Sequence, residues 1–350
     1  MSEIPSISLR TGSSQTSEIE KAGQRAMTKK IILLALCSLL LAPCSAVDAQ
    51  QTGKVSRIGF LDPSNASGVA GLLKAFRQEL GKLGWIEGKN IAIEYRFAEG
   101  KNDRLPELAA DLVRLKVDLI LVSGTTPALA AKRATTTIPI VMTNPGNPVG
   151  VGLVASLARP GGNVTGSSSL SFELNTKRLE ILTEVVPKLA RVGLLLTTGT
   201  LQLKDLRDAA QALKLKVEEI ETKADAKGLE SAFKTAKQKQ VNAIMTTAAS
   251  SFFAERKRIV ELGAKYRLPA IYWQKEFVFE GGLMSYGSDY DDLYRRAAVY
   301  VDKILKGAKP ADLPVQQATK FEFVINLKAA KQIGLTISPR VLERANKVIK

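Results

Sequence analysis

Short loops rich in hydroxyl and amide side chains directly follow several apolar, β-branched segments of this chain. The loop Ser123-Gly124-Thr125-Thr126-Pro127 is the most informative, because hydroxyls and backbone N–H groups converge there at the predicted start of a helix. We expect Thr126 to be the N-cap and Pro127 to take the first helical position. Such a helix start presents preformed donors to a carboxylate or another anion. The alternative is that Thr126 only caps its helix.

Two other loops, Asp62-Pro63-Ser64-Asn65 and Asn144-Pro145-Gly146-Asn147, follow neighbouring predicted strands. The carboxyl ends of parallel strands meet at one sheet edge, where open α/β sheets bind ligands. The second half of the chain places threonine pairs and aromatic rings at comparable strand ends, and the rings could stack a planar group. The candidate ligand-binding residues are Pro63, Ser64, Gly124, Thr125, Thr126, Asn144, Asn147, Thr197, Thr247, Tyr272, Trp273 and Tyr286. Each could instead serve only in a turn or in packing.

The residue types that most enzymes use are largely missing. The chain has no histidine, and Cys37 and Cys44 are its only cysteines. This excludes a Ser-His-Asp triad, a Cys-His pair and any zinc site that needs histidine. Neither a phosphate-binding loop nor a Gly-x-Gly-x-x-Gly turn is present. We therefore expect no catalytic residue, no cofactor and no metal. An enzyme that works with carboxylates or lysine remains the alternative.

The polar loops are positioned by strands that alternate with amphipathic helices from residue 55 onward, the pattern of βαβ units. Four such units fill residues 55–158, and the pattern restarts after the turn at 159–163. This predicts an α/β fold with two doubly wound, Rossmann-like lobes around a hinge. We assign 55–165 plus 288–312 to lobe 1 and 166–287 plus 313–350 to lobe 2. The crossings are expected at 159–168, near 287 and at 307–317.

Residues 1–49 are predicted to be an N-terminal extension and signal peptide. Lys29-Lys30 precedes an apolar run from Ile31 to Ala42, and Val47-Asp48-Ala49 offers small residues for cleavage. The run is shorter than the roughly 20 residues of a membrane span. We expect export to the periplasm, with Met27 as an alternative start. Lipid anchoring at Cys44 is less favoured, because Pro43 stands where a lipoprotein signal needs a small residue.

The formal net charge is +16, but the basic residues are scattered and no arginine-rich tail occurs. A solvated surface is therefore favoured over a nucleic-acid interface.

Long phrases of the sequence resemble one family in order along the chain. They are Leu83-Gly84-Trp85-x-Glu87-Gly88-x-Asn90, Tyr95-Arg96-x-Ala98-Glu99-Gly100, Ile138-Pro139-Ile140-Val141, residues 152–166, Gly281-Gly282-Leu283-Met284-Ser285-Tyr286-Gly287 and residues 298–314. Together they resemble the ABC-transporter substrate-binding family, typified by tryptophan- and phenylalanine-binding members, over residues 55–346.

The resemblance implies a type I periplasmic-binding-protein fold with three crossings, no enzymatic activity, and an ABC permease and its ATPase as partners of a monomer. The ligand would be a small molecule, such as an amino acid or a related carboxylate, held between the lobes. Family members often carry aspartate where this chain has Asn147, so an amine-binding charge would be lost here. A sensor that reports to a membrane receptor is the alternative. A transcription factor of this fold would need a DNA-reading motif where the export signal stands.

Overall fold

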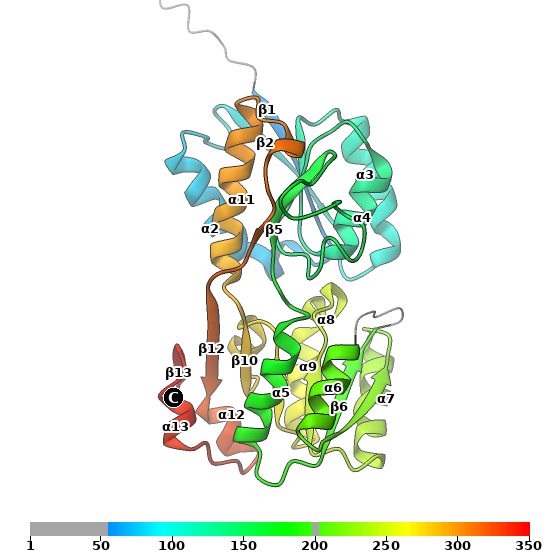
Figure 1. Ribbon diagram of the computed structural model, residues 1–350, viewed down its shortest axis with the longest axis vertical. Helices are drawn as coiled ribbons and strands as arrows, with labels where there is room; N and C mark the ends of the chain where they lie inside the picture. Colours follow the sequence, from blue (N-terminus) through cyan, green and yellow to red (C-terminus); the bar gives the residue numbers. More distant parts are fainter. Residues whose placement is uncertain (1–54, 198–202) are drawn as a thin grey trace, which may run out of the picture. The chain divides into compact units, whose positions relative to one another are not determined.

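The computed structural model describes residues 55–197 and 203–350, which form two α/β lobes, each built on its own sheet (Figure 1). The predicted export segment, both cysteines and Thr198 lie outside these residues. Most strand pairs are parallel, and helices cover both faces of each sheet. The predicted fold class of two doubly wound lobes is therefore confirmed.

The first lobe holds a six-stranded, wholly parallel sheet with the order β11-β5-β4-β3-β1-β2. Its strands are β1 (Ser56–Asp62), β2 (Ile91–Phe97), β3 (Leu119–Val122), β4 (Ile140–Met142), β5 (Val164–Ser168) and β11 (Gln316–Gln317). The central strands β3 and β4 are apolar and buried throughout, as expected for strands covered on both faces.

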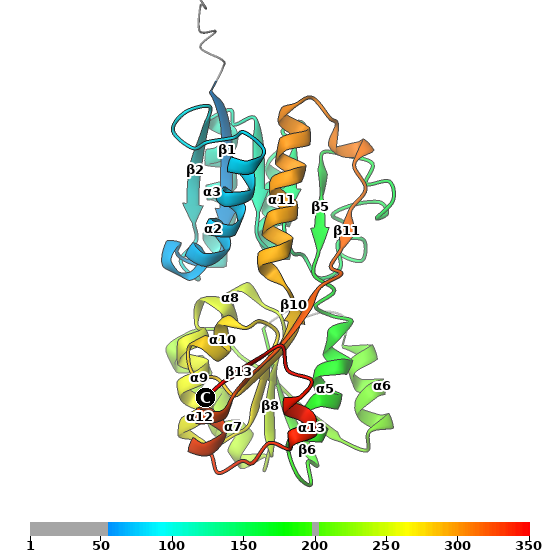
Figure 2. The same ribbon diagram turned by 90° about the vertical axis from the view of Figure 1, so that its left-hand side faces the viewer.

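Two pairs of helices cover the first sheet. They are α2 (Ala66–Lys82) with α11 (Tyr290–Leu305) on one face, and α3 (Leu105–Arg114) with α4 (Thr125–Ala134) on the other; short 3₁₀ turns lie at Asn102–Arg104 and Pro310–Asp312. Figures 1 and 2 both show α11 lying alongside α2, although more than 200 residues separate them. Trp85 follows α2 and donates its indole N–H to Asp302 of α11 at 2.8 Å. Trp85 is thus a link between these helices.

The second lobe holds a seven-stranded sheet with the order β13-β12-β10-β9-β8-β6-β7, in which only the β10–β12 pair is antiparallel. The strands are β6 (Arg191–Leu196), β7 (Lys216–Glu221), β8 (Ala243–Thr246), β9 (Ala270–Tyr272), β10 (Met284–Ser288), β12 (Phe321–Asn326) and β13 (Lys347–Ile349). An antiparallel strand near the edge of an otherwise parallel sheet is common in such folds.

Helices pack on both faces of the second sheet as well. One face carries α5 (Leu174–Val185), α6 (Lys204–Ala212), α12 (Leu327–Gln332) and α13 (Pro339–Leu342). The other carries α7 (Ala226–Gln238), α8 (Ser250–Ala254), α9 (Arg256–Lys265) and α10 (Glu276–Phe279).

The chain passes between the sheets three times, but not quite where the sequence predicts. The passages lie at residues 169–173, at residue 289 and at 318–320, between strands and helices of different lobes. Residues 166–168 belong to β5, and 316–317 form β11, so both stay in the first sheet. The boundaries predicted at 165 and 312 therefore fall a few residues early. Only the crossing predicted near residue 287 is close to its observed place.

Candidate functional site

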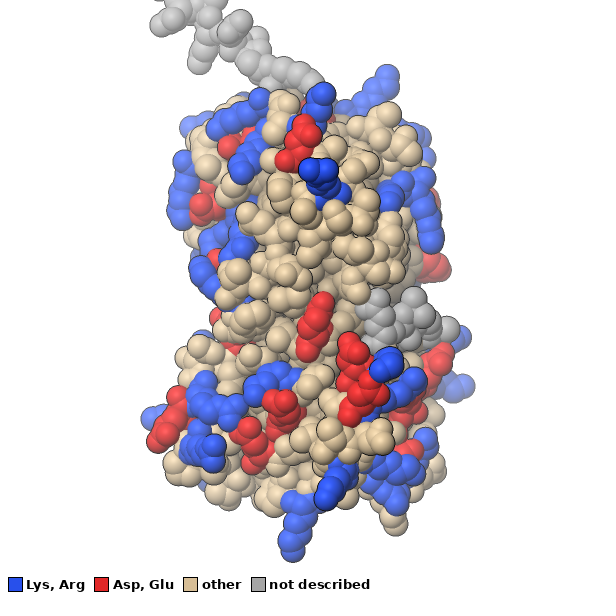
Figure 3. All heavy atoms as spheres, viewed as in Figure 1, with Lys and Arg blue, Asp and Glu red and all other residues tan. Residues whose placement is uncertain are grey.

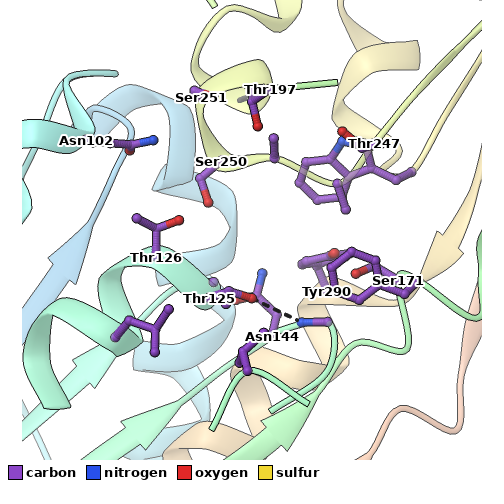
Figure 4. Close-up of a pocket in the computed structure, with 18 residues that line it drawn as sticks. Asn102, Thr125, Thr126, Asn144, Ser171, Thr197, Thr247, Ser250, Ser251 and Tyr290 are labelled. Carbon is purple, nitrogen blue, oxygen red and sulfur yellow. Dashed lines mark hydrogen bonds between the residues drawn. The ribbon is translucent and has the colours of Figure 1, made fainter. Parts of the chain in front are cut away.

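A cavity of about 260 Å³ opens between the two lobes at the carboxyl ends of their strands. This volume is close to the lower end of the roughly 300–1,000 Å³ range of small-molecule sites. Both lobes contribute uncharged polar side chains and a few apolar ones (Figure 4). The lining residues are Asn102, Gly124, Thr125, Thr126, Leu129, Asn144, Gly146, Val151, Ser171, Phe172, Thr197, Thr247, Ala248, Ala249, Ser250, Ser251, Trp273 and Tyr290.

Seven of the twelve residues chosen from the sequence line this cavity. They are Gly124, Thr125, Thr126, Asn144, Thr197, Thr247 and Trp273. They come from loops after β3, β4, β6, β8 and β9, which lie far apart in the sequence. The rule that parallel strands end at one edge brings them together. Their contact with a ligand remains a prediction.

Five other candidates do not line the cavity, and each has a structural role elsewhere. The side chain of Tyr272 is 1% exposed and its ring stacks on Phe277 with centroids 4.7 Å apart. Neighbouring residues of an extended strand point to opposite faces, so Tyr272 and Trp273 cannot both face the cavity. Tyr286 packs edge-on against Phe323, with centroids 6.2 Å apart.

The remaining three candidates are turn residues. Asn147 accepts a hydrogen bond from the backbone N–H of Gly150 at 2.8 Å, so its amide holds a turn. Pro63 and Ser64 are buried, and Ser64 donates its backbone N–H to Asp62 at 2.7 Å. Position 147, where the resemblance implies an aspartate in other members, therefore lies outside the cavity lining.

Sequence reasoning missed a group of lining residues that follow the crossings. Ser171 and Phe172 come just after β5, and Tyr290 begins α11 next to the second crossing. Because the first crossing was predicted too early, Ser171 and Phe172 were assigned to the interior of a lobe. Tyr290 was missed although the second crossing was predicted close to its observed place.

The start of α4 forms one wall of the cavity, with a geometry that differs from the predicted one. The N-cap is Gly124, not Thr126, and its φ of 90° suits glycine. Thr125, Thr126 and Pro127 take the first three helical positions, and no side chain caps them. Helix N-termini carry partial positive charge and unpaired N–H groups. Among the described residues, no N-cap side chain accepts from this helix start, so the wall offers backbone donors to a ligand.

Glycines allow the backbones around the cavity to come close together. A Cβ at Gly124 would lie 2.9 Å from Oγ of Ser250 in the other lobe, and one at Gly146 would lie 2.5 Å from the Phe172 ring. The Gly146 N–H also donates to Oγ1 of Thr125 at 3.4 Å, the contact drawn in Figure 4. A larger residue at either glycine would narrow the site.

A cluster of charges joins the lobes beside the cavity. The ammonium of Lys275, after β9, lies 2.7 Å from Asp291 of α11 and 2.9 Å from Glu322 of β12. Its side chain is 12% exposed, so water screens these contacts only partly. The cluster fixes α11 of the first lobe to β12 and to the segment after β9 in the second.

Among the residues described, no group of histidine, cysteine, aspartate and glutamate is arranged to hold a metal ion. In the same part of the chain, no helix is long and apolar enough to cross a bilayer. On the face shown in Figure 3, Lys and Arg are interspersed with Asp and Glu and form no continuous basic patch.

The two lobes, the three crossings and the cavity between them define a bilobal binding protein of the type I periplasmic class. The chain belongs to the ABC transporter substrate binding protein family, whose model matches residues 60–349.

Three relatives illustrate the likeness. A curated tyrosine-binding protein of Clostridioides difficile (strain R20291) is 27% identical over 328 residues, covering 88% of this chain and 93% of the relative. A conserved domain protein from Vibrio cholerae is 28% identical, with a TM-score of 0.78 over 84% of this chain and 100% of the other. An ABC domain in complex with L-Trp from Streptococcus pneumonia is 26% identical, with a TM-score of 0.76, and the match covers 84% of this chain and 99% of the other.

Proposed function

We propose that this protein is the extracytoplasmic solute-binding component of an ABC importer, and that it binds a small carboxylate, such as an amino acid or a related acid, between its lobes. The observation that carries the proposal is the cavity itself, which both lobes line with hydrogen-bonding groups. Such sites usually combine apolar walls with a few oriented polar groups.

The family supports a binding role rather than a catalytic one. One relative is a tyrosine-binding protein, and another has been solved in complex with L-Trp. Among the described residues, those that line the cavity include no charged side chain that could act as a general acid or base. The partners proposed are a permease and its ATPase, which would recognise the closed lobes of a monomer.

The predicted signal peptide supports export, and the location proposed is the periplasm. Fractionation followed by N-terminal mass spectrometry tests this point. We expect a mature chain that begins at Gln50 and carries no lipid on Cys44. A chain retained in the cytoplasm with residues 1–49 intact would contradict the proposed location.

A thermal-shift screen over amino acids, other carboxylates and small sugars tests the binding function. A ligand that binds only the folded state increases the free energy of unfolding, by about 2.7 kcal/mol at a ligand concentration of 100 times its Kd. This stabilisation raises the melting temperature. The variant Gly146→Val places a branched side chain against Phe172 inside the cavity and should abolish the shift. Gly71→Val is the matched control, because Gly71 has open space around it. A solute that stabilises the Gly146 variant as well as the wild type would place binding outside the cavity.

A further inference from the structure

We infer that the cavity selects an aryl-substituted carboxylate that lacks an ammonium group, in preference to the zwitterionic α-amino acid of the same shape. The inference rests on the proposed function, because it takes the inter-lobe cavity as the ligand site. It is carried by three features of the site: a lining without charged side chains, hydrogen-bond donors in two of its walls, and a buried cation behind one wall.

The first feature is the absence of a carboxylate where an ammonium group would need one. All eighteen lining residues within the described part of the chain are uncharged. A buried ammonium group without a paired carboxylate loses its hydration at a cost of several kcal/mol. The hydroxyls and amides present can accept hydrogen bonds from an amine, but they cannot neutralise its charge.

The second feature is a pair of donor groups, one on Trp273 and one at the start of α4. Trp273 lines the cavity, its side chain is only 6% exposed, and its indole N–H is buried without a hydrogen-bond partner. A buried donor left unpaired costs about 1–3 kcal/mol, which an acceptor on a ligand would recover. The uncapped start of α4 adds backbone N–H groups at Thr125 and Thr126. Oδ1 of Asn102 is an unpaired acceptor in the same lining, and rotation of its amide would present its NH₂ group instead.

The third feature is Arg178 of α5, which is fully buried and has no carboxylate within 4 Å among the described ion pairs. Its guanidinium donates to the carbonyl of Tyr286 at 2.7 Å, to the carbonyl of Ser171 at 3.2 Å and to the amide oxygen of Asn175, while Nη2 has no partner. Burial lowers the pKa of Arg178 to about 10, so it remains a cation at neutral pH. Because Ser171 lines the cavity, this charge raises the potential of the wall behind it.

One acidic group near the site acts in the opposite direction. Glu276 interacts electrostatically with Tyr290, a lining residue, and its Oε2 is buried without a partner. Burial raises the pKa of Glu276 to about 7, so it carries only part of a negative charge at neutral pH. Glu276 is not a lining residue, and Lys275 beside it offsets the remaining charge. It therefore does not replace the missing ammonium partner.

The aryl group is suggested by the apolar part of the lining. Trp273, Tyr290 and Phe172 contribute aromatic rings, and Trp273 and Tyr290 contact each other with centroids 5.6 Å apart. Aromatic rings favour planar apolar groups, which they contact by stacking or edge-on.

The experiment compares matched pairs by titration calorimetry on the full mature chain: phenylpropionate against L-phenylalanine, and indolepropionate against L-tryptophan. We expect the acid without the amine to bind at least tenfold more tightly in one of the pairs. Equal binding, or tighter binding of the amino acid, would overturn the inference and leave the proposed function intact. If sugars bind but no carboxylate does, the inference is also wrong. If no solute binds, the proposed function fails as well.

A pair of isosteric variants gives a second readout. Asn144→Asp adds a carboxylate to the lining, and we expect it to shift the preference at least tenfold toward the amino acid of each pair. Asn147→Asp adds the same charge three residues away, in a turn outside the lining, and should leave the preference unchanged. An unchanged preference in Asn144→Asp, or a shift as large in Asn147→Asp, would contradict the inferred lack of an amine partner in the cavity.

Discussion

The carboxyl group of Asp62 should make the protein less stable as the pH rises, and the variant Asp62→Asn should remove this effect. Asp62 ends β1, is 1% exposed, and accepts hydrogen bonds from the backbone N–H and hydroxyl of Ser64. Burial raises the pKa of Asp62 from 3.8 to about 6. The folded protein therefore holds a proton that the unfolded chain has already released between these pH values.

The direction and size of the change in stability follow from this difference in pKa between the folded and unfolded states. Below pH 3.8 both states hold the proton on Asp62; between pH 3.8 and 6 folding takes up a proton, so stability falls as the pH rises. A shift of about 2 pKa units at 1.36 kcal/mol each amounts to about 3 kcal/mol, lost in full above pH 6. Asparagine can accept the same bonds from Ser64 without ionising. We expect Asp62→Asn to be up to about 3 kcal/mol more stable than the wild type at pH 8, with little difference near pH 4.

Urea denaturation of both proteins at pH 4, 6 and 8 measures this difference. Other carboxyl groups titrate in both proteins and cancel in the comparison. Asp103→Asn is the matched control, because it removes the same charge from an exposed position. A difference between Asp62→Asn and the wild type that stays constant across this pH range would refute the reasoning, because a buried ionising group cannot produce it.

Two further predictions concern the lobes. Lys275→Met should lower the free energy of unfolding by about 1–3 kcal/mol at pH 7, because Asp291 and Glu322 lose a shared, partly buried cation. The loss should become smaller at acid pH, where both carboxylates are protonated. A loss that does not change with pH in urea denaturation would contradict this prediction. Gly166→Ala should lower the free energy of unfolding by more than about 3 kcal/mol, because φ is +130° and the new Cβ would lie 2.1 Å from a backbone carbonyl of β4. Gly71→Ala, which has open space around it on α2, should raise the free energy of unfolding by about 0.5–1 kcal/mol. Equal melting temperatures of the two variants would contradict this prediction.

Most of the fold could be predicted because its strands and helices follow local patterns. The buried run Leu119–Val122 and the amphipathic helices have periods that a single chain shows. The error came at β5, whose residues Val164–Ser168 are small and mostly polar and resemble a connection. Its place in the sheet depends on pairing with β4 and with the two-residue strand β11, which is a tertiary event. The composition of residues 164–168 alone therefore does not predict this strand.

The sequence predicts the lining residues that directly follow parallel strands. It does not predict those whose position depends on packing between distant parts of the chain. Thr125, Asn144 and Thr247 follow parallel strands and meet as expected. The choice between Tyr272 and Trp273 depends on which side of β9 faces the cavity, and the alternation of a strand shows only that one of the two must be wrong. Ser171 and Tyr290 line the cavity because of crossings whose positions no local pattern reveals.

The pairing of α11 with α2 also governs the order in which the chain can fold. The strands of the first sheet, apart from β11, are complete by residue 168, yet one of its faces lacks a covering helix until residue 305 has been made. A chain that emerges from the ribosome N-terminus first therefore cannot finish its first lobe until most of the second has followed. Such a delay would keep the nascent polypeptide open during synthesis, which suits the export proposed above.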